Sequence, residues 1–160
     1  MLRILDITAP DINNGNGIRI TLWVAGCSHK CKGCHNAWTW GYNQGIKFIE
    51  NQDEILNILS NWLQRDYADG ITFSGGDPLD QDRLSLSELM QLIKWVRRNY
   101  PSKTIWLYTG YEYEKLNKYQ KEITDSCDAV VDGPFIEEKK TFDCPFRGSS
   151  NQRIIKKGTS

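Results

Sequence analysis

Three cysteines, Cys27, Cys31 and Cys34, follow one another at intervals of four and three positions. Thiolate sulfur is the usual ligand of iron–sulfur clusters, most of which are bound by four cysteines. Three thiolates from one short loop can bind three irons of a [4Fe–4S] cube and leave the fourth iron without a protein ligand. An open metal position favours chemistry, as in zinc enzymes that keep one position for water or substrate. The spacing therefore predicts a reactive iron–sulfur site.

The same cysteines allow a second interpretation, a structural zinc site. His29, His35 or Cys144 would then complete a closed tetrahedron. Zinc sites of this kind usually contain two cysteine pairs, and the sequence has no second pair. Iron–sulfur binding is the favoured interpretation, and a zinc-stabilised binding module without catalysis is the distant alternative.

The hydrophobic pattern predicts alternating strands and helices that would position these residues. Asn51 with Glu54, and Ser85 with Glu88, have the spacing of helix capping boxes. Strands are expected at 19–24, 71–74, 104–109 and 129–132, with short ones at 2–5 and 153–155; helices are expected at 51–63, 85–96 and 113–121, and loop at 35–50.

This order of elements indicates a parallel sheet with right-handed crossovers. The cysteine loop, the turn at 75–78 and the segments 108–110 and 132–133 each follow a predicted strand. Because the carboxyl ends of parallel strands meet at one edge of the sheet, we expect these four segments to converge there. A closed eight-stranded barrel needs about 200 residues, so the 160-residue chain predicts one α/β domain over residues 1–160. We expect a partial, open βα barrel of about five to six mainly parallel strands, whose open flank could admit a polypeptide loop.

Composition excludes several classes of protein. Hydrophobic residues make up 39% and charged residues 25%, which is typical of a globular chain. Lys+Arg and Asp+Glu both number 20, so net charge gives no support for nucleic-acid or membrane-surface binding. The sequence has no apolar run of the roughly 18 residues that span a membrane and no signal peptide at its start, so we expect a cytoplasmic protein.

The total of five cysteines argues against a disulfide framework because the number is odd. Cys127 and Cys144 lie far from the cysteine cluster along the sequence. We expect both to be bystanders.

The cysteine spacing, together with Gly75-Gly76-Asp77-Pro78, resembles the radical S-adenosylmethionine superfamily. Within that superfamily the chain resembles the small activating proteins of anaerobic (class III) ribonucleotide reductases. The closer resemblance spreads over most of the chain and rests on the segments 15–17, 26–38, 74–79, 106–111, 131–135 and 146–152.

The resemblance implies that Cys27, Cys31 and Cys34 bind a [4Fe–4S] cluster whose fourth iron is chelated by the amino and carboxylate groups of S-adenosylmethionine. One electron from the cluster would then break the sulfonium C–S bond, giving methionine and a 5′-deoxyadenosyl radical. That radical would take a hydrogen atom from a backbone glycine of the reductase's catalytic subunit and leave a glycyl radical. The implied partners are that subunit and an unidentified one-electron donor, for which a flavodoxin is a candidate. Activation of a different glycyl-radical enzyme, or chemistry on a small molecule, is the alternative.

The resemblance also implies contacts to S-adenosylmethionine. The backbone of Gly75 and Gly76 would lie against the methionyl group, since a residue without Cβ allows a ligand to approach closely. Asp77 stands where the superfamily usually has glutamate, and it would either receive the ligand's ammonium group or cap a helix. Tyr108, Thr109 and Asp132 are expected near the ribose and the carboxylate.

The residues around the third cysteine complete the expected contacts: Gly33, Cys34, His35 and Asn36. Many superfamily members have an aromatic residue near the adenine at the position of Gly33, so His35 or Trp38 would replace it here. Arg147, with Ser149, Ser150 and Asn151, would bind the nucleoside or dock the reductase. The resemblance assigns no catalytic residue beyond the cluster ligands.

Overall fold

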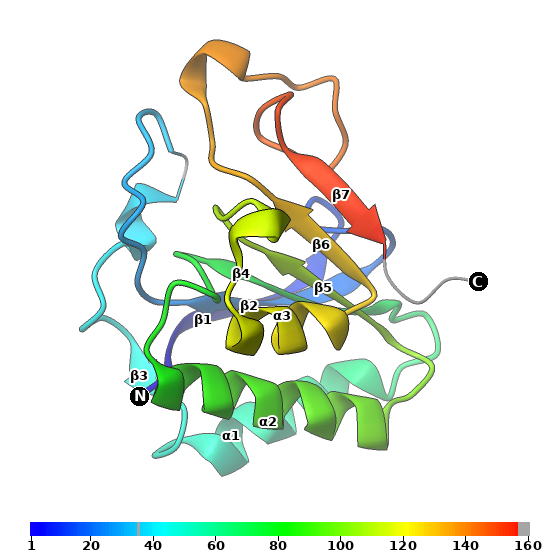
Figure 1. Cartoon of the computed structure of the whole chain (residues 1–160). Helices are drawn as coiled ribbons and strands as arrows, with labels where there is room; N and C mark the ends of the chain where they lie inside the picture. Colours follow the sequence, from blue (N-terminus) through cyan, green and yellow to red (C-terminus); the bar gives the residue numbers. More distant parts are fainter. Residues whose placement is uncertain (35, 157–160) are drawn as a thin grey trace.

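The computed structural model describes residues 1–34 and 36–156 and contains a seven-stranded mixed sheet (Figure 1). The strands are β1 (Arg3–Asp11), β2 (Arg19–Val24), β3 (Ile46–Lys47), β4 (Gly70–Gly75), β5 (Thr104–Tyr108), β6 (Ala129–Asp132) and β7 (Arg153–Lys156). The helices are α1 (Gln52–Leu63), α2 (Arg83–Asn99) and α3 (Lys118–Asp125), with short 3-10 helices η1 (Ala37–Thr39), η2 (Tyr113–Lys115) and η3 (Glu137–Lys139). The strand order is β3-β1-β2-β4-β5-β6-β7.

The four central strands, β2, β4, β5 and β6, run parallel to one another. Val24 at the end of β2 lies beside Gly75 at the end of β4, and Tyr108 at the end of β5 lies beside Val131 of β6. Helices α1, α2 and α3 make the three crossovers between these strands. The carboxyl ends of the four strands therefore meet at one edge, where parallel sheets usually bind ligands.

The predicted open α/β architecture is confirmed, with seven strands in place of five or six. The additional strand is β3, which lies in a segment expected to be loop and pairs with Arg3 and Ile4 of β1. Strands β1, β3 and β7 are antiparallel to their neighbours and extend the parallel centre on both sides. The strand expected at 2–5 also continues to Asp11.

All three helices cover the same face of the sheet (Figure 1). Because side chains alternate between the faces of a strand, every second residue of the central strands is buried against the helices. Phe73, Leu107 and Val130 are examples, and they share one core with Leu89 and Leu92 of α2. Within the described residues, no helix has the length and apolar character needed to cross a bilayer.

The opposite face of the sheet has a smaller apolar cluster and a separate cover. Trp106, Ala129 and Val131 are buried there and pack against Phe146. Phe146 belongs to residues 133–152, called the cap segment below, which connect β6 to β7 on the side of the sheet away from the helices (Figure 1). The sheet therefore has a fully packed helical face and a second face that is covered by irregular chain.

The helix starts differ from those predicted. α2 begins after Asp82, whose side chain accepts a hydrogen bond from the Ser85 backbone N–H at 2.8 Å. Glu88, predicted to form a capping box with Ser85, instead accepts a 2.6 Å hydrogen bond from the backbone N–H of Leu2. Asn51 precedes α1 as predicted, but its side chain makes no capping hydrogen bond.

Candidate functional site

A cavity of about 400 Å³ lies at the carboxyl ends of the parallel strands. All three clustered cysteines line it, together with the backbone of the glycine turn after β4 and the end of β5. The structure thus brings together segments that are far apart in the sequence. The lining residues are Asn13, Asn14, Trp23, Cys27, His29, Cys31, Cys34, Asn36, Trp40, Ser74, Gly75, Gly76, Tyr108, Thr109, Gly110, Gly133, Phe135, Phe146, Arg147, Gly148 and Gln152.

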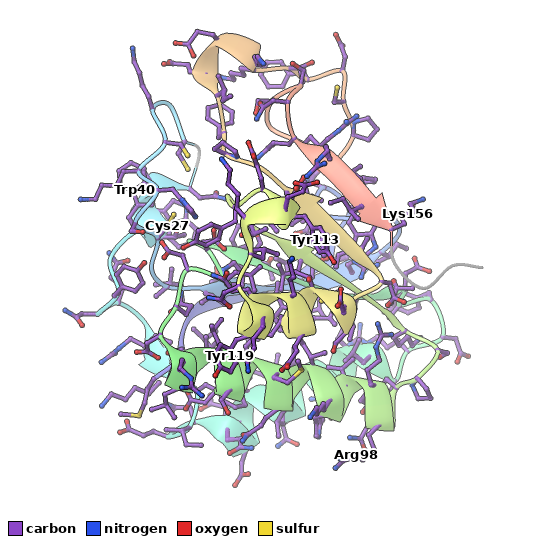
Figure 2. All side chains as sticks on the ribbon, viewed as in Figure 1. Cys27, Trp40, Arg98, Tyr113, Tyr119 and Lys156 are labelled. Carbon is purple, nitrogen blue, oxygen red and sulfur yellow. The ribbon has the colours of Figure 1, made fainter. Side chains whose placement is uncertain are left out.

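The cysteine loop begins directly after β2 and is held against the glycine turn. The Asp77 N–H donates to the Gly26 carbonyl at 2.7 Å, and a Cβ added at Gly76 would lie 2.3 Å from that oxygen. Only glycine fits at this close approach. On its other side, the Cys27 N–H donates to the Trp40 carbonyl at 3.2 Å. Figure 2 shows Cys27 and Trp40 together at this end of the sheet.

Two carboxylates that follow β4 anchor the first half of the loop. Asp77 Oδ2 accepts a 2.6 Å hydrogen bond from His29 Nε2, and this bond raises the pKa of His29. Asp80 Oδ2 accepts from the Ser28 backbone N–H at 2.6 Å and also from the Ser28 hydroxyl. The turn after β4 therefore positions Ser28 and His29, the two residues that follow Cys27.

The second half of the loop contacts the cap segment. Lys32 Nζ lies 3.8 Å from a carboxylate oxygen of Glu137, and Gly33, at φ +75°, lies against the same side chain. Cys34 Sγ accepts a 3.4 Å hydrogen bond from the Asn36 N–H. The cap segment and the turn after β4 thus hold the loop from two sides.

Burial raises the pKa of two of the thiols, Cys27 and Cys31, in the metal-free protein. It raises the pKa of Cys27, which is 8% exposed, to about 12, and Asp77 and Asp80 add to the rise. The pKa of Cys31 is raised by burial as well, although a hydrogen bond from the Phe135 backbone opposes the shift. These thiols are neutral near pH 7 without metal, so metal binding must release their protons.

The three cysteine sulfurs do not all lie as close to one another as ligands of one zinc ion would. Zn–S bonds of about 2.3 Å in a tetrahedron place sulfurs about 3.8 Å apart. Among the described residues, the group of three potential ligand atoms within 4.8 Å of one another is Cys27, His29 and Asp80, and not the three cysteines. His29 and Asp80 already hold hydrogen bonds to Asp77 and Ser28. The zinc alternative gains no support from this geometry, whereas a cluster binds each cysteine through a different iron.

Three residues expected to contact the ligand lie outside the cavity lining: Gly33, Asp77 and Asp132. Gly33 is exposed and faces Glu137. Asp77 is 1% exposed and accepts hydrogen bonds beneath the cavity. Asp132 is also 1% exposed, and it pairs with the Arg153 guanidinium at 2.5 Å. Both carboxylates serve internal hydrogen bonds here because burial leaves a charged oxygen in need of donors.

The other expected contacts divide as follows. Cys34, Asn36, Gly75, Gly76, Tyr108 and Thr109 line the cavity, as do the metal-ligand candidates Cys27 and Cys31. His35 lies outside the described residues. Trp38 does not line the cavity: it is 52% exposed, with its ring 6.0 Å from that of Trp23. Cys127 and Cys144 are not among the lining residues either.

Several lining residues were missed from the sequence. Trp23 and Ser74 could have been found, since they alternate along their strands with residues of the helix-side core. Asn13 and Asn14 belong to the connection between β1 and β2 and give no local signal. Phe146 reaches the cavity through the cap segment, at the unusual φ of +64°.

Arg147 presents a charged group to the cavity. Phe146, just before it, is held by a 2.7 Å hydrogen bond from the Tyr108 hydroxyl to its carbonyl and by ring contact with Trp106. The Arg147 Nη1 donates to the Gln152 carbonyl at 3.3 Å. Its Nε is buried, and no described residue accepts a hydrogen bond from it. Arg147 therefore brings a cation and a buried N–H, unpartnered within the described residues, to the wall of the cavity.

Ser149, Ser150 and Asn151 have structural contacts within the cap segment. Ser149 is fully buried and its hydroxyl accepts from the Ile136 N–H at 3.3 Å. The Asn151 amide donates to the Pro134 carbonyl at 2.8 Å. Ser150 donates its backbone N–H to the Lys139 carbonyl, also at 2.8 Å. Of this group, Arg147 is the residue that faces the cavity.

Comparison with known proteins gives the chain's relatives. Residues 13–155 match the family described as "4Fe-4S single cluster domain". The anaerobic ribonucleoside-triphosphate reductase-activating protein of Haemophilus influenzae is 39% identical over 145 residues, which covers 90% of this chain and 91% of that protein. Proteins of the same name from Escherichia coli K12 and enterobacteria phage T4 are 41% and 39% identical over 90% of this chain, and the matches cover 92% and 87% of their own lengths.

A solved structure, QueE from Escherichia coli, is similar at a TM-score of 0.45 and 15% identity, over 69% of this chain and 53% of QueE, which is too distant to bear on fold or function. The family match and the curated relatives each extend over most of the chain. The chain therefore belongs to the 4Fe-4S single cluster domain family and, within it, to the anaerobic ribonucleoside-triphosphate reductase-activating proteins.

Proposed function

We propose that this chain binds a [4Fe–4S] cluster through Cys27, Cys31 and Cys34 and uses it with S-adenosylmethionine to install a glycyl radical on the catalytic subunit of anaerobic ribonucleotide reductase. The names of the curated relatives support the target. The observation that carries the proposal is the opening of all three cysteines onto one cavity at the carboxyl ends of the parallel strands. Among the described lining residues, the one imidazole, His29, already pairs with Asp77 and does not close the metal site.

When bound, the reduced cluster would supply the electron for reductive cleavage of the sulfonium of S-adenosylmethionine, which is the chemistry needed to remove a hydrogen atom from a glycine of the partner. The protein's part is orientation and the exclusion of competing reactions. The backbone of Gly75 and Gly76 lines the cavity and is proposed to lie against the methionyl group, while both positions require glycine because a Cβ would collide with the backbone of Val24 or Gly26. We propose that Tyr108 and Thr109, which line the cavity at the end of β5, contact the nucleoside.

Arg147 is proposed to bind the carboxylate of S-adenosylmethionine. Its guanidinium has five N–H donors and no acceptor, and a carboxylate is the group that such a fork binds best. The cavity lining contains no aspartate or glutamate that would compete for it among the described residues. Bound carboxylate would also supply a partner for the buried Nε.

The partner must deliver a backbone glycine to this cavity. The sheet is open, with β3 and β7 as its two edges, so the strands do not enclose the site. We propose that residues 1–160 act as one domain and that a loop of the reductase enters from the open side. The proposal also requires an external one-electron donor, for which a flavodoxin is the candidate.

Anaerobic reconstitution with iron and sulfide tests the proposal. The reduced protein should cleave S-adenosylmethionine and, when mixed with the reductase subunit, produce the EPR doublet of a glycyl radical. Cys31→Ser should abolish both, while Cys144→Ser, which removes a thiol outside the cavity, should retain both.

Three outcomes would contradict the proposal in different ways. Failure to assemble a cluster, or cleavage by Cys31→Ser at the unsubstituted rate, would overturn the chemistry. Cleavage without the doublet would keep the chemistry and reject this partner, in favour of another glycyl-radical enzyme or a small-molecule substrate.

A further inference from the structure

Asp77 occupies a position where the resemblance implies either a contact to the ligand's ammonium group or a helix cap, yet its carboxylate is buried and accepts hydrogen bonds from within the protein. Oδ2 accepts hydrogen bonds from His29 Nε2 at 2.6 Å, the Thr109 hydroxyl at 3.0 Å and the Gly110 N–H at 2.8 Å. Oδ1 accepts from the Leu79 N–H at 2.9 Å. Three donors use the full acceptor capacity of Oδ2, and Oδ1, with one donor, belongs to a residue that is 1% exposed and is not among the described residues that line the cavity.

His29 is fixed by more than this hydrogen bond. Its ring stands edge-to-face with that of Tyr111, with the centroids 4.6 Å apart. A Cβ added at Gly110 would lie 2.8 Å from His29 Cδ2, so the backbone after β5 also packs against the ring. His29 lies between Cys27 and Cys31 in the sequence, and its side chain therefore ties the middle of the cysteine loop to the ends of β4 and β5.

The loop needs tertiary anchors because, within the described part of the chain, it has no regular secondary structure of its own. Between β2 and η1 the described residues form no helix or strand. Lys30 and Gly33 both have φ in the left-handed region, at +51° and +75°. Ordering irregular backbone costs about 1–2 kcal/mol of conformational entropy per residue, so tertiary contacts must hold the loop before a cluster binds.

We infer that Asp77 acts through His29 to hold the cysteine loop in the conformation that receives the cluster, and that the pair positions the ligands without contacting the bound nucleotide. The inference rests on the proposed function only in taking Cys27, Cys31 and Cys34 as the cluster ligands. It assigns the ammonium group of S-adenosylmethionine to other acceptors at the cavity.

The test uses the metal-free protein, so that loop order is measured without cluster chemistry. Lys30 and Lys32 are exposed and provide trypsin sites inside the loop. His29→Leu and Asp77→Asn should each speed cleavage after these lysines by about tenfold or more, because loss of a hydrogen bond to a charged group favours local opening. Mass spectrometry of the early fragments identifies the bond that is cut.

Three further variants give the test its controls. His29→Gln keeps a donor near the position of Nε2, so it should restore most of the protection that His29→Leu loses. His29→Leu combined with Asp77→Asn should cleave no faster than either single variant, because both remove the same interaction. Glu88→Gln, which alters a carboxylate that is also buried but anchors Leu2, should leave loop cleavage unchanged.

Cleavage of His29→Leu and Asp77→Asn at the unsubstituted rate would overturn the inference, and so would additive effects in the double variant. If Asp77→Asn does not fold, the three-way comparison of the unsubstituted protein, His29→Leu and His29→Gln still decides, since the His29 side chain is partly exposed. Failure of the proposed function would appear instead as a protein that assembles no cluster, whatever the trypsin result.

In the loaded protein the same pair should govern how long the cluster lasts. Iron should pass to a chelator about tenfold faster from His29→Leu and Asp77→Asn than from the unsubstituted protein, with His29→Gln between them. Equal iron loss from all three variants and the unsubstituted protein would overturn the inference for the holoprotein.

Discussion

Single residues decide which group of the ligand the cavity recognises. Among the described lining residues, Arg147 has a buried hydrogen-bond donor, its Nε, without an acceptor. Its Nε is buried without an acceptor among the described residues, which is costly unless a ligand supplies one. Phe146, directly before Arg147, has a strained φ of +64°, and this backbone conformation sets the direction from which the Arg147 side chain extends. Strain of this kind persists where the surrounding structure enforces it, and here Tyr108 and Trp106 do so.

Arg147→Gln should weaken binding of S-adenosylmethionine to the reconstituted protein by about tenfold or more, since it removes a charge-assisted fork. Equilibrium dialysis under anaerobic conditions measures the affinity. Decarboxylated S-adenosylmethionine lacks the carboxylate, so the unsubstituted protein and Arg147→Gln should bind it with nearly equal affinity. Arg98→Gln is the matched control, because Arg98 lies in the last turn of α2, away from the cavity (Figure 2). An equal loss of affinity for both compounds would show that Arg147 does not bind the carboxylate.

At the scale of elements, α2 depends on a cap that the sequence pattern placed incorrectly. Asp82, and not Ser85, caps the helix, and the Ser85 backbone N–H lowers the pKa of the Asp82 carboxyl. Asp82→Ala should lower the free energy of unfolding by about 1 kcal/mol. Chemical denaturation at pH 7 measures the change.

The same cap gives a pH dependence with a definite sign. A carboxyl whose pKa is lowered by folding adds stability above its unfolded pKa, near 3.8, and loses that contribution as the pH falls through the lower folded value. Asp82→Asn caps without titrating. The difference in melting temperature between the unsubstituted protein and Asp82→Asn should therefore be constant above about pH 5. Below pH 4 the unsubstituted protein should become less stable relative to Asp82→Asn. A difference that does not change with pH would contradict this role of Asp82.

Sequence patterns predicted the central elements because their signals are local. β2, β4, β5 and β6 are runs of β-branched and aromatic residues, and each was placed within one or two residues. β3 was missed because its two residues become a strand only by pairing with β1. The helix predicted at 113–121 is η2 followed by α3, and α3 starts at a capping box of Asn117 and Gln120 that was not recognised.

The sequence predicted those parts of the candidate site that depend on the spacing of neighbouring residues. It predicted less well the parts that depend on contacts between segments far apart in the sequence. Cysteine spacing and the paired glycines identify their parts of the cavity without a structure. Whether a buried carboxylate faces a ligand or an internal donor is a tertiary property. Asp132 was expected at the ligand, and Asp77 either at the ligand or as a helix cap, but both bind donors from other segments, such as Arg153 and His29. Local sequence does not indicate which donors will surround them.

At the scale of the whole molecule, the two faces of the sheet have different tasks. The helix-side core joins the central strands with α1 and α2, and it contains most of the buried apolar side chains. The smaller cluster on the other face, with Trp106 and Val131 at its centre, holds the cap segment through Phe146. Because the clusters are separate, a change that loosens the cap segment should weaken ligand binding strongly while the protein remains folded.

Phe146→Ala tests this division. The Phe146 ring stacks edge-to-face on Trp106 at 5.4 Å and is only partly buried, so its loss should lower the free energy of unfolding by about 1–3 kcal/mol. Leu92→Ala, in the helix-side core at 1% exposure, should cost about 2–5 kcal/mol. Trypsin should cut the cap segment faster in Phe146→Ala but not in Leu92→Ala, and affinity for S-adenosylmethionine should fall only in Phe146→Ala.

Phe146→Gly relieves the φ of +64° yet also removes the ring, so binding as weak as that of Phe146→Ala would identify ring packing as the cause. If Leu92→Ala exposes the cap segment as much as Phe146→Ala does, the two faces form one cooperative unit and the division is wrong.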